Sequence, residues 1–154
     1  MKFSIKVGSV EKIKSDCLVA VIWSKGILSD EAGLIDIAAK KALSKLLRSG
    51  DFTGKLGETH LIHDPVGSAA KRLLLVGGGD RRKMSAKNAA KLLASSLKKA
   101  FTLNASSVHF ALASLELNDR EPAWLAARLA QQAERASYSY DTTKSKKSRS
   151  PTIK

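Results

Sequence analysis

The 154-residue sequence predicts an α/β fold, a three-layer α/β/α sandwich around a mostly parallel mixed sheet. One observation is the unbroken apolar run at residues 17–23, which is typical of a strand covered by helices on both faces. A second is that strand patterns alternate with helical patterns of ten or more residues. The third is length, because a chain of this size fits one domain with one core.

Two strands and one helix are predicted in the first third of the chain. Residues 2–7 alternate polar and apolar side chains, and this period of two favours a strand with one buried face. Residues 17–23 form the second predicted strand. Ser29 then begins one helix that ends at Gly50. The apolar stripe of this helix consists of Ile35, Ala38, Ala39, Ala42, Leu43 and Leu46.

The middle of the chain predicts two neighbouring strands joined by a turn. Residues 50–59 are glycine-rich and form a turn-rich approach to the first of these strands. The strands are predicted at residues 59–63 and 72–76, with a turn at residues 64–67 between them. The glycines at residues 77–79 predict a flexible turn through which the chain leaves the sheet.

The second half of the chain predicts helix, strand and helix. Ser85 caps a helix that extends to Phe101 and carries apolar residues at helical spacing. Residues 107–112 have the composition of a strand. Pro122 occupies the first turn of a last helix, which runs toward Tyr140.

The sequence contains no local motif of a metal site or a catalytic nucleophile, because HExxH, CxxC, EF-hand and GxSxG patterns are absent. His60 and His63 lie three apart on one predicted strand, so their side chains point to opposite faces. Cys17, inside an apolar run, is expected to pack as a small hydrophobe. The glycines at residues 77–79 precede a helix and leave open a phosphate or nucleotide site there, although no phosphate-loop spacing is present.

Positive charge dominates the composition, because 27 Lys and Arg residues against 14 Asp and Glu residues leave a net charge of +13. Residues 71–99 hold nine of the basic residues against one acidic residue, Asp80. Without interleaved aromatic residues, such a cluster predicts at most weak, nonspecific binding of nucleic acid, and a solvated helix face is the simpler interpretation. The candidate polyanion contacts are Arg81, Arg82, Lys83, Lys87, Lys91 and Lys98.

Three blocks of the chain carry a family resemblance. Residues 50–59 read Gly-Asp-Phe-Thr-Gly-Lys-Leu-Gly-Glu-Thr, residues 72–79 read Arg-Leu-Leu-Leu-Val-Gly-Gly-Gly, and residues 138–147 read Tyr-Ser-Tyr-Asp-Thr-Thr-Lys-Ser-Lys-Lys. In order and spacing they resemble three segments of the N-terminal domain of leucyl (cytosol) aminopeptidases. The third segment is the junction with the catalytic domain, and here Tyr140 stands where Phe is usual and Thr143 where Tyr is usual.

The resemblance implies a macro-domain-like fold for residues 1–137 and a basic interdomain linker, disordered or an extended helix in the fragment, for residues 138–154. It implies that this chain holds no cofactor, because two divalent ions, zinc or manganese, bind in a separate catalytic domain that carries an Asn-Thr-Asp-Ala-Glu-Gly-Arg motif. The partners implied are that catalytic domain and the other subunits of a homo-hexamer. The linker residues are Tyr138, Tyr140, Asp141, Lys144, Lys146 and Lys147.

The expected function is therefore a non-catalytic domain with an assembly or regulatory role in a metal-dependent aminopeptidase. A basic nucleic-acid-binding domain and a macro-like module for ADP-ribose or another nucleotide are the alternatives. The longest apolar run is far shorter than the roughly 20 residues that cross a bilayer, so no membrane partner is expected. Lysines at positions 2 and 6 interrupt any secretory signal, which predicts a cytoplasmic location.

Overall fold

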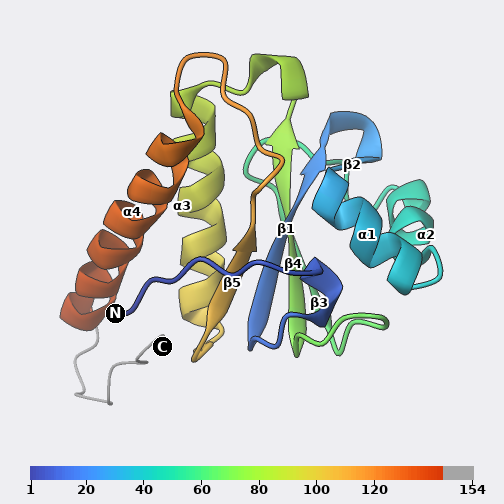
Figure 1. The fold of residues 1–154 in the computed structure, drawn as a ribbon, viewed down its shortest axis with the longest axis horizontal. Coiled ribbons are helices and arrows are strands. Elements are labelled where there is room, and N and C mark those ends of the chain that lie inside the picture. The colour runs from blue at the N-terminus through green and yellow to red at the C-terminus, as the bar shows by residue number, and fades with distance from the viewer. Residues whose placement is uncertain (144–154) are drawn as a thin grey trace.

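The computed structural model describes residues 1–143 and places a five-stranded mixed sheet between two layers of helices (Figure 1). The strands are β1 (Cys17–Trp23), β2 (Ile27–Leu28), β3 (Thr59–His63), β4 (Arg72–Gly79) and β5 (Val108–Ala111). The helices are α1 (Asp30–Ala38), α2 (Ala42–Ser49), α3 (Ala86–Thr102) and α4 (Pro122–Thr143). Three short 3-10 helices, η1 (Val10–Lys12), η2 (Ser24–Gly26) and η3 (Arg81–Lys83), connect them.

The sheet is organised around β1, which pairs in parallel with β4 on one side and with β5 on the other. The register places Val19 opposite both Leu74 and Phe110. β2 pairs antiparallel with the carboxyl end of β1, and β3 pairs antiparallel with β4. The predicted α/β/α sandwich with a mixed sheet is thus confirmed.

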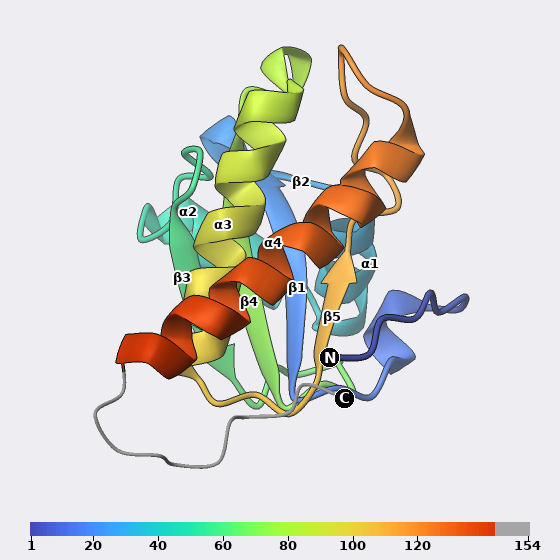
Figure 2. The same ribbon diagram turned by 90° about the vertical axis from the view of Figure 1, so that its left-hand side faces the viewer.

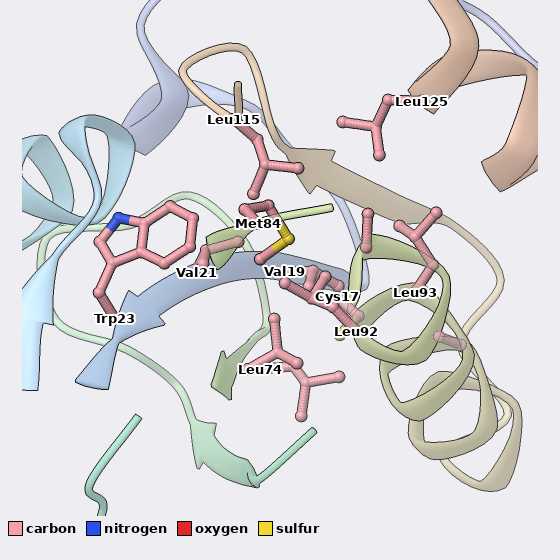
Figure 3. Packing of buried hydrophobic residues seen from close by; sticks show 13 residues of the cluster. Cys17, Val19, Val21, Trp23, Leu74, Met84, Leu92, Leu93, Leu115 and Leu125 are labelled. Atoms are coloured by element: carbon pink, nitrogen blue, oxygen red, sulfur yellow. The ribbon is translucent and has the colours of Figure 1, made fainter. Parts of the chain in front are cut away.

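Two apolar cores lie on opposite faces of the sheet, because side chains alternate along each strand. One β1 face, with Cys17, Val19, Val21 and Trp23, packs against α3 and α4 (Figures 2 and 3). The other face packs against α1 and α2 through Leu18, Ala20 and Ile22. Every residue of β1 is buried, as its continuous apolar sequence predicts. Within residues 1–143, no helix has the length and apolar content of a membrane span.

The region predicted as one helix from Ser29 to Gly50 forms two helices. The chain turns between α1 and α2, and Lys40 and Lys41 adopt left-handed backbone angles with φ of 52° and 65°. A buried carboxylate stabilises the break: Asp36 accepts hydrogen bonds from the Ser44 N–H at 3.0 Å and the Ser44 hydroxyl at 2.5 Å. Asp36 thereby caps the first turn of α2 from the preceding helix.

The strand predicted at residues 2–7 is absent. These residues are irregular, and the apolar side chains of Ile5 and Val7 are 91% and 99% exposed. An alternating sequence forms a strand only where another strand offers backbone partners. Within residues 1–143 no strand pairs with this segment.

Candidate functional site

Two glycine-rich segments that are separate in the sequence meet at the carboxyl end of β4. The Gly57 N–H donates to the Gly77 carbonyl at 2.9 Å, and the Gly77 N–H donates to the Glu58 carbonyl at 2.7 Å. The Gly79 N–H donates to the Gly54 carbonyl at 3.0 Å. We call Gly54, Gly57, Gly77, Gly78 and Gly79 the glycine junction. It joins two of the three blocks on which the family resemblance depends.

The prediction of a flexible turn at residues 77–79 is wrong, because β4 continues through Gly79 and these residues are buried. Close packing explains the glycines. A β-carbon on Gly78 would lie 2.7 Å from carbons of the Trp23 ring, and one on Gly77 would collide with the Lys55 carbonyl. Glycine at these positions leaves room for atoms of neighbouring segments of the same chain. It is not there to make the backbone flexible.

Glu58 closes the loop that approaches this junction. Its carboxylate accepts hydrogen bonds from the Thr53 hydroxyl at 2.8 Å, the Thr53 N–H at 3.1 Å and the Lys55 N–H at 3.0 Å. Burial by itself raises the pKa of Glu58, but these hydrogen bonds outweigh it and hold the pKa below its usual range. The hydrogen-bond partners of this carboxylate thus belong to its own loop.

The open alternative of a phosphate or nucleotide site at the start of α3 is not favoured by the local geometry. The Ala86 N–H donates to Asp119 Oδ1 at 2.8 Å, and the Asn88 N–H donates to Ser85 Oγ at 3.3 Å. A carboxylate therefore already occupies the place that an anion would take. Sequence reasoning missed Asp119, because it lies 33 residues from Ala86 and carries no local signal. Leu115, Met84 and Trp23 belong to one apolar cluster, and their side chains lie near one another (Figure 3).

The candidate polyanion contacts divide between η3 and α3. Arg81, Arg82 and Lys83 form η3, immediately before α3, and all three are exposed. Lys87, Lys91 and Lys98 lie on α3 at spacings of four and seven residues, which place them on one exposed helix face. None of the six forms an ion pair with another residue in the range 1–143. The six thus lie along η3 and one exposed face of α3, and their binding of a polyanion stays a prediction.

The described side chains do not fit a metal ion. No three His, Cys, Asp or Glu side chains within residues 1–143 come together as a potential ligand group. Several carboxylates already have partners within the domain. Glu31 accepts two hydrogen bonds from Ser114, and Asp16 Oδ1 forms an ion pair with Lys71 Nζ at 2.7 Å. His60 packs edge-on against the Phe52 ring at a centroid distance of 6.1 Å, while His63 is exposed. The buried Cys17 thiol has its pKa raised by burial to about 11, in keeping with its predicted role in the core.

The predicted linker is partly described. Helix α4 runs through positions 138, 140 and 141, and Tyr138 is 75% exposed. Lys144, Lys146 and Lys147 lie outside the described residues. The assignment of residues 138–154 as an interdomain linker therefore stays a prediction.

The model of the cytosol aminopeptidase family, N-terminal domain, matches residues 18–147. A probable cytosol aminopeptidase of Methylobacillus flagellatus is 38% identical over 146 residues, which are 95% of this chain and 29% of that relative. One from Dechloromonas aromatica is 34% identical over 147 residues, covering 96% of this chain and 30% of the relative. This chain thus spans less than a third of the length of these relatives.

Solved structures show the same fold. A mutant of tomato leucine aminopeptidase superposes with a TM-score of 0.64 and 19% identity over 90% of this chain and 28% of its own. The macrodomain of Mycobacterium tuberculosis DarG superposes with a TM-score of 0.62 and 13% identity over 88% of this chain and 89% of its own. At these identities the likeness concerns the fold alone, which is macro-domain-like.

Proposed function

Because this chain belongs to the N-terminal domain family of the cytosol aminopeptidases, we propose that it is the non-catalytic domain of a leucyl aminopeptidase, with a role in assembly or regulation. The observation that carries the proposal is the family match over residues 18–147 in a chain that spans only 29% of its relative from M. flagellatus. The parent enzyme in this proposal removes N-terminal amino acids from peptides. Its chemistry lies in a catalytic domain separate from this one.

The side chains of this domain support the division of labour. The two divalent ions of the parent, zinc or manganese, need several free carboxylate, amine or imidazole ligands in one place. The buried Asp36 and the half-buried Glu58 instead accept hydrogen bonds from backbone and hydroxyl groups of their own domain. The proposal accordingly assigns the metals to the catalytic domain, and it assigns no step of the reaction to this chain.

The partners proposed for this domain are its own catalytic domain and the other subunits of a homo-hexamer. The location proposed is the cytoplasm, as the name of the related cytosol aminopeptidases suggests. These proposals follow from family membership.

An activity assay tests the absence of catalysis. We expect the purified chain, supplied with manganese or zinc, to release no p-nitroaniline from leucine-p-nitroanilide. Turnover that follows the chain through purification at constant specific activity, and that a chelator abolishes, would contradict the proposal. Sequencing the gene beyond Lys154 tests the parent directly: the reading frame should continue into the Asn-Thr-Asp-Ala-Glu-Gly-Arg motif, and a stop codon at that point would refute it.

A second candidate function, weak binding of nucleic acid, is favoured by the alignment of Lys87, Lys91 and Lys98 on one face of α3. Lysines in a row track a phosphate backbone by charge, without reading base sequence. Duplex DNA titrated at two salt concentrations tests the idea. Replacing the three lysines with serine should reduce the slope of log affinity against log salt by about 2 to 3.

The matched control for this experiment replaces three exposed lysines outside η3 and α3, Lys12, Lys14 and Lys45, and so removes the same charge. If net charge alone attracts the duplex, both triple variants will lose the same affinity. Undetectable binding by the unsubstituted chain at low salt would dismiss the candidate.

A further inference from the structure

The outer face of helix α1 is apolar. Leu34 and Ile37, three residues apart and therefore neighbours on the helix surface, are 51% and 65% exposed. Asp30, one turn before Leu34, is exposed on the same face, while Ala32 and Ile35 on the other side of the helix are buried. Figure 1 shows α1 on the side of the sheet away from α3 and α4.

Two other helices show what a solvated face consists of in this domain. The exposed positions of α2 include Lys45 and Arg48, and those of α3 include Lys87, Lys91 and Lys98. A surface helix normally keeps such charged residues outward, and a helix that is apolar on all sides is normally buried. The composition of α1 is therefore that of a helix with a partner on both sides.

Charges of opposite sign flank the two apolar side chains of this face. Asp30 lies in the first turn of α1, and Lys40 is exposed just beyond its last turn. Neither forms an ion pair with another residue in the range 1–143. The order along the face is acid, two apolar residues and base. This order is complementary to itself when a second helix of the same sequence lies antiparallel to the first.

We propose that the outer face of α1, formed by Asp30, Leu34, Ile37 and Lys40, pairs with the same face of a second copy of this chain across a two-fold axis. Leu34 of each copy then lies against Ile37 of the other, and Asp30 lies near Lys40. One patch supplies both sides of the contact, as a two-fold interface requires. The inference goes beyond the proposed function, because it needs no catalytic domain, and its failure would leave the family assignment intact.

The contact is small, which sets the affinity to expect. The nine residues of α1 extend about 14 Å, and two helices of this length bury less surface than the roughly 1,200 Å² of a stable interface. The net charge of +13 on each copy adds repulsion, which salt at about 0.15 M screens beyond about 8 Å. We therefore expect a weak dimer with a Kd on the order of 0.1 mM at that salt concentration.

Sedimentation equilibrium of the chain at concentrations up to about 1 mM tests the proposal, and the average mass should rise from monomer toward dimer. Leu34→Asp combined with Ile37→Asp should leave only monomer at every concentration. Both side chains are more than half exposed in the single chain, so the double variant should fold. Circular dichroism compares its secondary structure with that of the unsubstituted chain.

A charge swap tests the antiparallel arrangement without altering the apolar residues. Asp30→Lys should weaken the dimer by about 3- to 10-fold, because it places like charges together at both ends of the contact. Adding Lys40→Asp restores the pair with its signs exchanged and should recover the affinity. Glu134→Lys is the matched control, since it makes the same change in net charge at an exposed position of α4 and should weaken the dimer much less.

A chain that stays monomeric over the whole concentration range would overturn the inference and leave the outer face of α1 to a different partner. A dimer that persists in the Leu34→Asp, Ile37→Asp variant would place the interface elsewhere, and would also overturn it. Equal losses for Asp30→Lys and Glu134→Lys, with no recovery in the charge swap, would show that net charge governs the association and would contradict the antiparallel pairing.

Discussion

At the scale of single residues, the glycine junction shows that the same residue type serves different physical purposes. Gly57 has φ of 82°, a left-handed conformation that a side chain disfavours. Gly78 has no such backbone requirement and is glycine because the Trp23 ring lies against it. Gly33, a half-buried residue of α1, has nothing within 4 Å of the position of a β-carbon. The local sequence does not distinguish these cases, because the atoms that decide them come from distant segments.

Replacing Gly78 with alanine is therefore expected to destabilise the fold by about 1 to 3 kcal/mol, because the new methyl group overlaps the Trp23 ring in a closely packed core. Gly33→Ala is the matched control, and it should be neutral or stabilising by up to about 1 kcal/mol because alanine favours a helix. Urea unfolding curves measure both free energies of unfolding. Equal stability of the two variants would contradict the packing described for the glycine junction.

At the scale of elements, sequence patterns locate most helices and strands but miss one break. Ser85 caps α3 where the sequence predicts it, and Pro122 begins α4. These signals act within one turn of helix and are readable locally. The break between α1 and α2 depends on Asp36, which is buried and bonded to Ser44 eight residues later. The pattern of apolar positions continues across the turn between α1 and α2. It therefore gives no indication that the helix breaks there.

Asp36→Ala should destabilise the chain by about 1 to 3 kcal/mol, because it leaves the partly buried Ser44 N–H at the start of α2 without its acceptor. Asp30→Ala is the control: Asp30 is an exposed acid in the first turn of α1, and its loss should cost about 0.5 kcal/mol. Thermal unfolding followed by circular dichroism compares the two. A loss for Asp36→Ala no larger than for Asp30→Ala would contradict the capping role.

At the scale of the whole molecule, one carboxylate connects the amino ends of three strands. Asp16, immediately before β1, forms an ion pair with Lys71 before β4 and accepts hydrogen bonds from Ser106 before β5. Lys71, followed by Ser106, holds the pKa of Asp16 well below its usual range. The three partners are up to 90 residues apart in sequence, so only the fold brings them together.

This arrangement predicts how stability depends on pH. A carboxylate with a lowered pKa in the folded state stabilises the fold fully above its unfolded pKa of about 3.9, and this stabilisation is lost as pH falls toward the folded value. Asp16→Asn should lose about 1 to 2 kcal/mol at pH 7, and its deficit should shrink as pH falls from about 4 toward 2. Urea unfolding at a series of pH values measures this change, with the surface variant Asp51→Asn as control. A loss of stability that stays constant over this pH range would show that the charge of Asp16 does not contribute to the stability of the fold.

The sequence by itself determined the α/β class, the buried central strand, the helix starts at Ser85 and Pro122, and the family resemblance, because period, capping and ordered motifs are local properties. Tertiary structure alone decided that the glycines of residues 77–79 end a strand, that Asp119 occupies the start of α3, and that residues 2–7 pair with no strand within residues 1–143. Each of these depends on atoms supplied by a distant segment. Strand pairing, close packing and capping in space are settled by contacts between segments, which no local pattern encodes.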